Sequence, residues 1–161
     1  MSTATAPPPL LHIALITPEI PQNTGNIGRL CVGIGARLHL VRPLGFSLDE
    51  KAVRRAGIDH WRRVDLQVHD DQEAFLAWAA GRRVHAFTRH AERCYSQASF
   101  EADDVLVFGR ESTGLPEGLL RTLTCWRIPV PGPIRSLNLA NAVAVVAYRA
   151  LEAISPALFQ G

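Results

Sequence analysis

The stretch IPVPGPIRSLNLANAV, residues 128–143, joins the end of an apolar strand to an alanine- and valine-rich helix through a loop bracketed by prolines. We expect the strand to cover residues 125–130 and the helix to begin at about Leu139. Ser136 and Asn138 stand where helix N-caps are found, so their side chains and the free N–H groups behind them can hold a polar or anionic ligand. For an isolated segment, an ordinary cap between a core strand and a core helix is the better interpretation.

Two other segments share this order of features. PEIPQNTGNIGRL, residues 18–30, and FGRESTGLP, residues 108–116, each continue from an apolar strand, contain a polar loop with glycine and lead into a helix. Because the carboxyl ends of parallel strands meet at one edge of a sheet, three strand exits of one kind predict a single shared site at that edge.

The chain has 161 residues, 47% of them hydrophobic, which is enough for one compact domain with a core and too few for two ordinary domains. We expect a disordered tail over residues 1–9, a single domain over 10–155 and a C-terminal tail over 156–161. Neither a signal peptide nor a membrane span is indicated. The cysteines form no CxxC pair, so the sequence predicts no metal site and no disulfide framework, and it favours a reducing cytoplasm.

Apolar strand patterns alternate with helical patterns along the chain. This alternation is typical of an α/β domain with a mainly parallel sheet flanked by helices. The expected strands cover residues 11–17, 37–42, 64–68, 84–88, 105–109 and 125–130, and the expected helices cover 25–36, 48–56, 70–80 and 116–122 before the closing helix.

The helix expected over residues 25–36 contains four glycines, each of which costs up to about 1 kcal/mol relative to alanine inside a helix. Such a helix indicates that something approaches its backbone closely, either a partner helix or a nucleotide. Further along, residues 51–63 form the densest basic patch of the chain and include Arg54 and Arg55. Trp61 in this patch either stacks on a base or anchors the loop.

The closing helix has apolar residues on two sides. One stripe is formed by Leu139, Ala142, Val143, Val146, Ala150 and Ile154, and a second side is kept small by Ala140, Ala144 and Ala147. A helix with two apolar sides usually packs against two separate structural elements or subunits. The sheet accounts for one side, and a second subunit accounts for the other, so we expect a homodimer.

Several common catalytic motifs are missing from the sequence. It has no GxxxxGK[ST] phosphate loop, no GxSxG elbow and no HExxH metal motif. The nearest match to a dinucleotide fingerprint, residues 33–35, ends a helix where the fingerprint requires the start of one. The six histidines are scattered, and a surface or core position is the default for each.

The polar residues of the three loops together resemble the signature motifs of the SPOUT superfamily, the trefoil-knotted RNA methyltransferases. Asn23 stands six residues before Arg29, the second motif reads FGxExxGLP, and the third reads IP followed by SLNLxxAV, all in the order of the family. Among its subfamilies the chain is most similar to the TrmL-type group. That resemblance implies 2′-O-methylation of the wobble nucleotide of tRNA, a cytidine or modified uridine.

The resemblance also implies a C-terminal trefoil knot that binds S-adenosylmethionine, and a role for each matching residue. The implied catalytic residues are Arg29, Glu111, Ser136 and Asn138. The implied cofactor-binding residues are Phe87, Thr88, Gly109, Ile128 and Ser136, and the RNA-binding residues are Asn23, Asn26, Arg54 and Arg55. At Ala140 the family frequently has a serine, so one polar contact is missing here.

Two alternatives remain at this point: a sibling enzyme that methylates ribosomal RNA or another tRNA position, and an RNA-binding module without catalysis. The role of Arg29 is also open. In the mechanism usually given for the family, this arginine removes the proton of the ribose hydroxyl, but a guanidinium stays protonated at neutral pH. Arg29 is equally able to clamp a phosphate and stabilise the developing alkoxide while water takes the proton.

Overall fold

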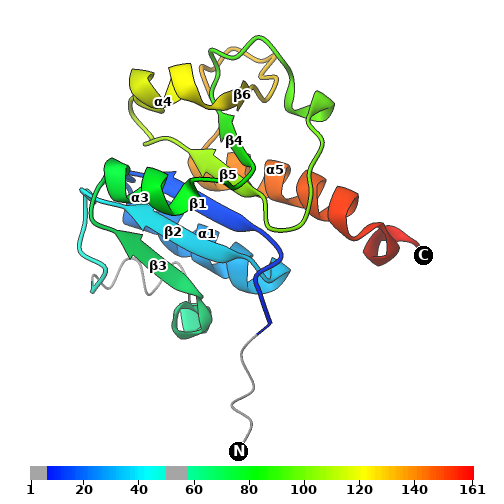
Figure 1. Ribbon diagram of the computed structural model, residues 1–161, viewed down its shortest axis with the longest axis horizontal. Helices are drawn as coiled ribbons and strands as arrows, with labels where there is room; N and C mark the ends of the chain where they lie inside the picture. The colour runs from blue at the N-terminus through cyan, green and yellow to red at the C-terminus, as the bar shows by residue number, and fades with distance from the viewer. Residues whose placement is uncertain (1–6, 50–57) are drawn as a thin grey trace, which may run out of the picture.

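The computed structural model describes residues 7–49 and 58–161, and its centre is a sheet of six parallel strands in the order β3-β2-β1-β5-β4-β6 (Figure 1). The central strands β1 and β5 are buried along their whole length, as continuous apolar runs in parallel sheets usually are. The predicted α/β class is therefore confirmed. The strands are β1 (His12–Ile16), β2 (Arg37–Val41), β3 (Leu66–His69), β4 (Val84–Phe87), β5 (Val105–Phe108) and β6 (Thr124–Trp126).

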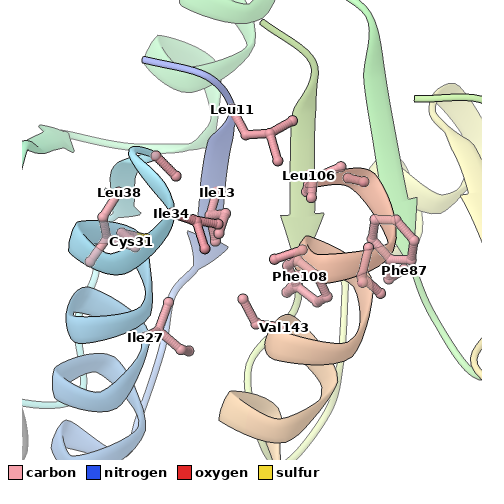
Figure 2. Packing of buried hydrophobic residues seen from close by; sticks show 14 of the residues in the cluster. Leu11, Ile13, Ile27, Cys31, Ile34, Leu38, Phe87, Leu106, Phe108 and Val143 are labelled. Carbon is pink, nitrogen blue, oxygen red and sulfur yellow. The ribbon is translucent and has the colours of Figure 1, made fainter. Parts of the chain in front are cut away.

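Helices cover both faces of the sheet. On one face, α1 (Pro21–Ile34) and α5 (Leu139–Ile154) pack on residues such as Ile13. Figure 2 shows Ile27 and Cys31 of α1 and Val143 of α5 in this layer. On the other face, α3 (Gln72–Ala79) and α4 (Glu117–Thr122) cover alternate strand residues such as Ala14. The alternation follows from the two-residue period of a strand.

Part of the apolar surface of α5 is already covered within the chain. Ala147 is fully buried in the core, and α5 packs directly against α1 of the same chain. The small alanine side thus allows close approach of an internal helix. The apolar side chains that α5 leaves exposed are Val145 and Tyr148.

Helix α1 begins at Pro21, four residues before the predicted start at Gly25. Proline is well suited to the first turn because its missing N–H would have no helical partner there. The helix ends at Ile34, and Gly35 adopts a left-handed conformation (φ 73°) that closes it, so the predicted extension to residue 36 is wrong. Asn23 consequently lies on the helix and not in the turn predicted before it.

One helical glycine does have a close neighbour, although it is an aromatic side chain and neither of the two expected, a partner helix or a nucleotide. A Cβ atom at Gly28 would lie 2.7 Å from the ring of Trp61, which follows in the 3₁₀ helix η1 (Ile58–Arg63). Trp61 therefore anchors its loop against α1. By contrast, a Cβ at Gly33 would meet nothing within 4 Å.

Strand β6 is much shorter than the predicted 125–130. Trp126 pairs with Phe87, the last residue of β4, so the ladder ends with its partner strand, and Pro129 and Pro131 have no N–H with which to extend it. Instead, the N–H of Arg127 donates to Arg93 O at 2.8 Å, and the N–H of Tyr95 donates to Arg127 O at 2.9 Å. The segment after β6 is thereby attached to the segment after β4.

The other boundaries agree within the one or two residues by which such assignments commonly differ. Helix α3 begins after Asp71, whose side chain accepts from Ala74 N at 2.7 Å. The helix expected over 48–56 falls mostly outside the described residues. Residues 156–159, in the expected C-terminal tail, form a short 3₁₀ helix, η3 (Pro156–Phe159). In the described part of the chain, every helix is too short or too polar to cross a lipid bilayer.

Candidate active site

The three motif loops meet at the C-terminal edge of the sheet. The first follows β1, the second follows β5 beside it, and the third leads from β6 into α5. Sequence separations of about ninety residues and more are bridged there by direct hydrogen bonds. The predicted meeting of the three strand exits is therefore observed.

Glu111 joins the second loop to the first. Its carboxylate accepts from Glu19 N at 2.8 Å, from Ile20 N at 3.1 Å and from the side-chain amide of Asn23 at 3.3 Å. Ile20, the N-cap residue of α1, offers no side-chain cap. The carboxylate of Glu111 lies at this N-terminus and binds the N–H groups of Glu19 and Ile20 just before the helix, where a negative charge is favourable. Glu111 is thus occupied in holding the start of α1.

Glu19 makes the reciprocal connection. Its carboxylate accepts from Ser112 Oγ at 2.6 Å and Ser112 N at 3.2 Å, and it forms an ion pair with Arg110 Nε at 2.9 Å. Each loop therefore supplies one carboxylate to the polar groups of the other. We call Glu19, Asn23, Arg110, Glu111 and Ser112 the clasp. Glu19 is a site residue that the motifs did not indicate, although a lone acidic residue between two prolines was the available signal.

Asn138 connects the third loop to the clasp. Its Oδ1 accepts from Ala140 N at 2.9 Å and Asn141 N at 3.3 Å, which confirms it as the N-cap of α5. Its Nδ2 donates to Asn23 Oδ1 at 3.0 Å. One amide therefore fixes the start of α5 relative to the start of α1, and Asn23 links Asn138 to Glu111.

Three implied site residues make no such bonds. Arg29, Asn26 and Ser136 are exposed, and none of their side chains has a hydrogen bond or ion pair to another residue in the described part of the chain. The expectation that Ser136 caps α5 is wrong, because Asn138 alone occupies that position. These three side chains remain available to a ligand. Arg54 and Arg55 lie outside the described residues.

The residues implied for cofactor binding stand at the ends of three neighbouring strands. Phe87 is buried and stacks on Phe108, with ring centroids 5.0 Å apart (Figure 2). Next to it, Thr88 N donates to Trp126 O at 2.9 Å. Ile128, beyond β6, is half-buried against the core. This edge combines apolar surface with backbone polar groups, the mixture that a ligand such as an adenosine with an amino-acid tail requires.

Gly109 has a structural reason to be glycine. A Cβ atom there would lie 2.2 Å from the carbonyl carbon of Gly114, because the loop folds back through a bridge between Arg110 and Gly114. The close backbone approach gives the second loop its shape. Gly109 is therefore explained without a ligand, and its contact with a cofactor stays a prediction.

Buried histidines form two networks away from this site, which local sequence patterns gave no means to detect. Hydrogen bonds of 2.9 Å join His12 to His39 and His39 to His69 across β1, β2 and β3, and His12 Nε2 reaches Asp103 at 2.8 Å. Burial lowers the pKa of His39 to about 2. His39 is therefore neutral and belongs to the core, as the default interpretation expected.

The second network contains His85. Its Nδ1 accepts from Trp126 Nε1 at 3.1 Å, and its Nε2 donates to Asp104 at 3.0 Å. Tryptophan can only donate, so His85 must carry its proton on Nε2. Burial lowers the pKa of His85, and the hydrogen bond to Asp104 opposes that effect only in part.

Comparison with known proteins identifies the family. Residues 10–148 match the model of the SpoU rRNA Methylase family. The chain belongs to this family. It is 47% identical over 144 residues to the tRNA (cytidine(34)-2′-O)-methyltransferase of Methylovorus glucosotrophus, covering 88% of this chain and 94% of the relative. It is 44% identical over 144 residues to the enzyme of the same name from Escherichia coli K12, covering 88% and 92%.

Solved structures agree with this assignment. One that describes the 2-OH methylation of C/U34 on tRNA superposes with a TM-score of 0.87 at 49% identity, covering 89% of this chain and 95% of that one. The AdoMet-bound rRNA methyltransferase of Sinorhizobium meliloti superposes with a TM-score of 0.80 at 29% identity, covering 87% and 55%. The α/β fold is thus the fold of SpoU-type methyltransferases, and membership of this family carries the implication of a knot.

Proposed function

We propose that this protein transfers a methyl group from S-adenosylmethionine to the ribose 2′-oxygen of nucleotide 34 in tRNA. The observation that carries the proposal is the clasp, extended by Asn138, which brings all three motif loops into one site. The relatives that match nearly their whole length are named for this reaction. Because the similarity extends over nearly the whole length of these relatives, it supports the proposal that this chain acts on the same substrate.

The cofactor, when bound, supplies an electrophilic methyl group on a sulfonium. Thr88, Gly109 and Ile128, with the exposed Ser136, are the residues we assign to holding it at the ends of β4, β5 and β6. The reaction forms a bond from the ribose oxygen to carbon as the carbon–sulfur bond breaks, and the hydroxyl proton leaves. The site must therefore align donor and acceptor and stabilise the developing oxyanion.

Arg29 is the residue we assign to the acceptor. It is exposed on α1, and among the described residues no carboxylate neutralises it. A free guanidinium can grip a phosphate with two parallel hydrogen bonds and stabilise negative charge on a neighbouring oxygen. We assign proton removal to water, because a guanidinium does not accept a proton at neutral pH.

Glu111 and Asn138 act in this proposal as positioning residues. Their polar atoms are bonded within the protein, Glu111 to the start of α1 and Asn138 to α5 and Asn23. They fix the helix that presents Arg29 relative to the cofactor loops. Small displacements of such a helix can cost a large factor in rate, because the reacting atoms must be aligned.

We also propose that the working unit is a cytoplasmic homodimer. Val145 and Tyr148 are 38% and 50% exposed on α5, and an apolar patch on a helix of a small domain favours a two-fold contact. Sedimentation of the wild type and of Tyr148→Glu would test the contact. We expect a dimer for the wild type and weakened association for the variant, and a monomeric wild type with full activity would contradict this part of the proposal.

The experiment that tests the activity is methyl transfer from labelled S-adenosylmethionine to total RNA, followed by mapping of the modified nucleotide. We expect label in tRNA at nucleotide 34, on the 2′-oxygen. Label in ribosomal RNA or at another tRNA nucleotide would reassign the substrate. If the protein binds RNA but transfers no methyl group at any concentration of cofactor, it is an RNA-binding module without catalytic activity.

A further inference from the structure

A second group of arginines lies beside the site, on the segments that follow β4 and β6. Arg89, Arg93 and Arg135 are exposed, and Arg127 is half-buried. Residues 88–97 and 127–135 contain four arginines and one carboxylate, Glu92. The two segments run together, because Arg127 N donates to Arg93 O and Tyr95 N donates to Arg127 O. The positive charges are therefore held in one region at the C-terminal edge of the sheet.

These arginines are not neutralised by the protein. Arg89, Arg93 and Arg127 have no carboxylate within ion-pair distance in the described part of the chain. At the opposite edge of the sheet, Arg82 pairs with Asp103 and Arg83 pairs with Asp104, both at 2.9 Å. An unmatched cationic surface next to an active site attracts an anionic partner.

The arrangement of these side chains is also partly fixed in advance. The Arg93 guanidinium lies 4.6 Å from the centroid of the Trp126 ring, and the Trp126 ring is fixed by the hydrogen bond from its Nε1 to His85. A hydrogen bond from Ser96 and the charge of Arg127 lower the pKa of the Cys94 thiol, which places the Arg127 charge close to the same segment. Less side-chain entropy is lost when such preorganised groups bind.

We infer that Arg89, Arg93 and Arg127 form a surface that binds the backbone phosphates of the substrate RNA, next to the nucleotide held at Arg29. The inference rests on the proposed function and adds to it the part of the protein that grips the RNA chain. The planar fork of arginine suits phosphate oxygens, and contacts of this kind set affinity without reading sequence. Two tasks are thus separated: Arg29 on α1 serves the acceptor, and the three arginines bind phosphates of neighbouring nucleotides.

The test compares the triple variant Arg89→Gln/Arg93→Gln/Arg127→Gln with the wild type, using an unmodified tRNA transcript. Each phosphate contact in a single strand contributes about 0.7 to the slope of log affinity against log salt. We expect RNA affinity at low salt to fall at least about tenfold and the slope to decrease by about 2. Cofactor affinity and the rate at saturating RNA should stay at wild-type values.

The matched control is Arg121→Gln/Arg149→Gln, two exposed helical arginines near Glu117 and Glu152. We expect it to bind RNA like the wild type. The single variant Arg89→Gln, whose side chain has no bond to another described residue, keeps the test valid if the triple variant folds poorly. It should raise the KM for RNA and leave kcat unchanged.

Unchanged RNA affinity and salt slope in the triple variant would overturn the inference while leaving the proposed function intact. Loss of self-association with unchanged RNA affinity would also overturn it and would assign the surface to a second copy of the chain. A wild type that transfers no methyl group to any tRNA would instead contradict the proposed function.

Discussion

The two edges of the sheet contain the same residue types in opposite arrangements. At the N-terminal edge, Asp103 and Asp104 neutralise Arg82 and Arg83 and also bind buried histidines, so each charge is matched within the chain. At the C-terminal edge, Glu19 and Glu111 tie loops together. Arg110 there pairs with Glu19 and Arg42 lies 3.8 Å from Asp70, whereas Arg89, Arg93 and Arg127 have no carboxylate partner among the described residues. Matched charges stabilise the fold, whereas unmatched charges are available to a ligand. The contrast predicts which substitutions affect stability and which affect catalysis.

The largest effect on stability is expected for Asp104→Ala. Asp104 is 1% exposed and accepts from His85, Arg83 and Glu101 N. Removing it leaves those donors unpaired, so the free energy of unfolding should fall by about 3–4 kcal/mol. Urea unfolding measures this change, and methyl transfer per folded molecule should be unaffected. The control Asp70→Ala removes an exposed carboxylate 3.8 Å from Arg42 and should cost less than about 0.5 kcal/mol.

Arg29→Ala is expected to affect catalysis and not stability. Stability should be unchanged because the side chain is exposed, whereas methyl transfer should fall roughly 10²–10³-fold, as for the loss of a group that stabilises developing charge. Single-turnover rates with saturating cofactor and RNA measure this loss. Arg29→Lys keeps the charge but loses the planar fork, so a two-point phosphate clamp predicts little rescue. Wild-type rates in Arg29→Ala would remove the residue from the mechanism.

A smaller, mixed effect is expected for Glu111→Gln, which keeps the shape of the clasp. The amide replaces one acceptor oxygen with a donor, so one of the three bonds from Glu19 N, Ile20 N and Asn23 is lost. Stability should fall by about 1–2 kcal/mol. The methylation rate should fall with it while the ordinary pH profile is kept, because Glu111 positions α1 and exchanges no proton. A shifted pH profile would instead indicate acid–base catalysis by Glu111.

The last prediction concerns the pH dependence of stability that the buried histidines cause, which is gradual and is expressed per pH unit. The pKa of His39 falls from 6.5 to about 2 in the folded protein, so below pH 6.5 the unfolded chain binds a proton that the folded chain excludes. Stability should therefore decrease as pH falls, by up to about 1.4 kcal/mol per pH unit for His39 alone. Burial also lowers the pKa values of His12, His69 and His85 and steepens the slope.

Urea unfolding between about pH 7 and pH 5 measures that slope. The exposed His90 provides the control, because His90→Gln should have the same slope as the wild type. Equal stability at both ends of the range would mean that the buried histidines become protonated without cost, which contradicts their place in the core.

The sequence predicted the elements well where the signal is local. The apolar runs gave β1 and β5, and the position of Asn138 gave the cap of α5. The two largest boundary errors are next to prolines: α1 begins early at Pro21, and β6 ends before Pro129. Proline changes which N–H groups exist, and hydropathy patterns do not register that change.

The contacts that build the site required the fold. Glu19 and Ser112 lie 93 residues apart, and Asn23 and Asn138 lie 115 apart, so no local pattern connects them. The histidine networks depend in the same way on the order of strands in the sheet. The motifs identified which loops matter, but the reciprocal exchange of Glu19 and Glu111 became visible only when those loops were placed side by side.

The most direct test of the proposed reaction uses tRNA substrates that differ in a single oxygen. One transcript has ribose at nucleotide 34, the position given in the names of the relatives, and its partner has 2′-deoxyribose at that nucleotide alone. The two should bind equally well, because the phosphates are unchanged. We predict stoichiometric methyl transfer to the first and none to the second. Equal transfer to both would contradict 2′-O-methylation at this nucleotide and would place the acceptor elsewhere in the RNA.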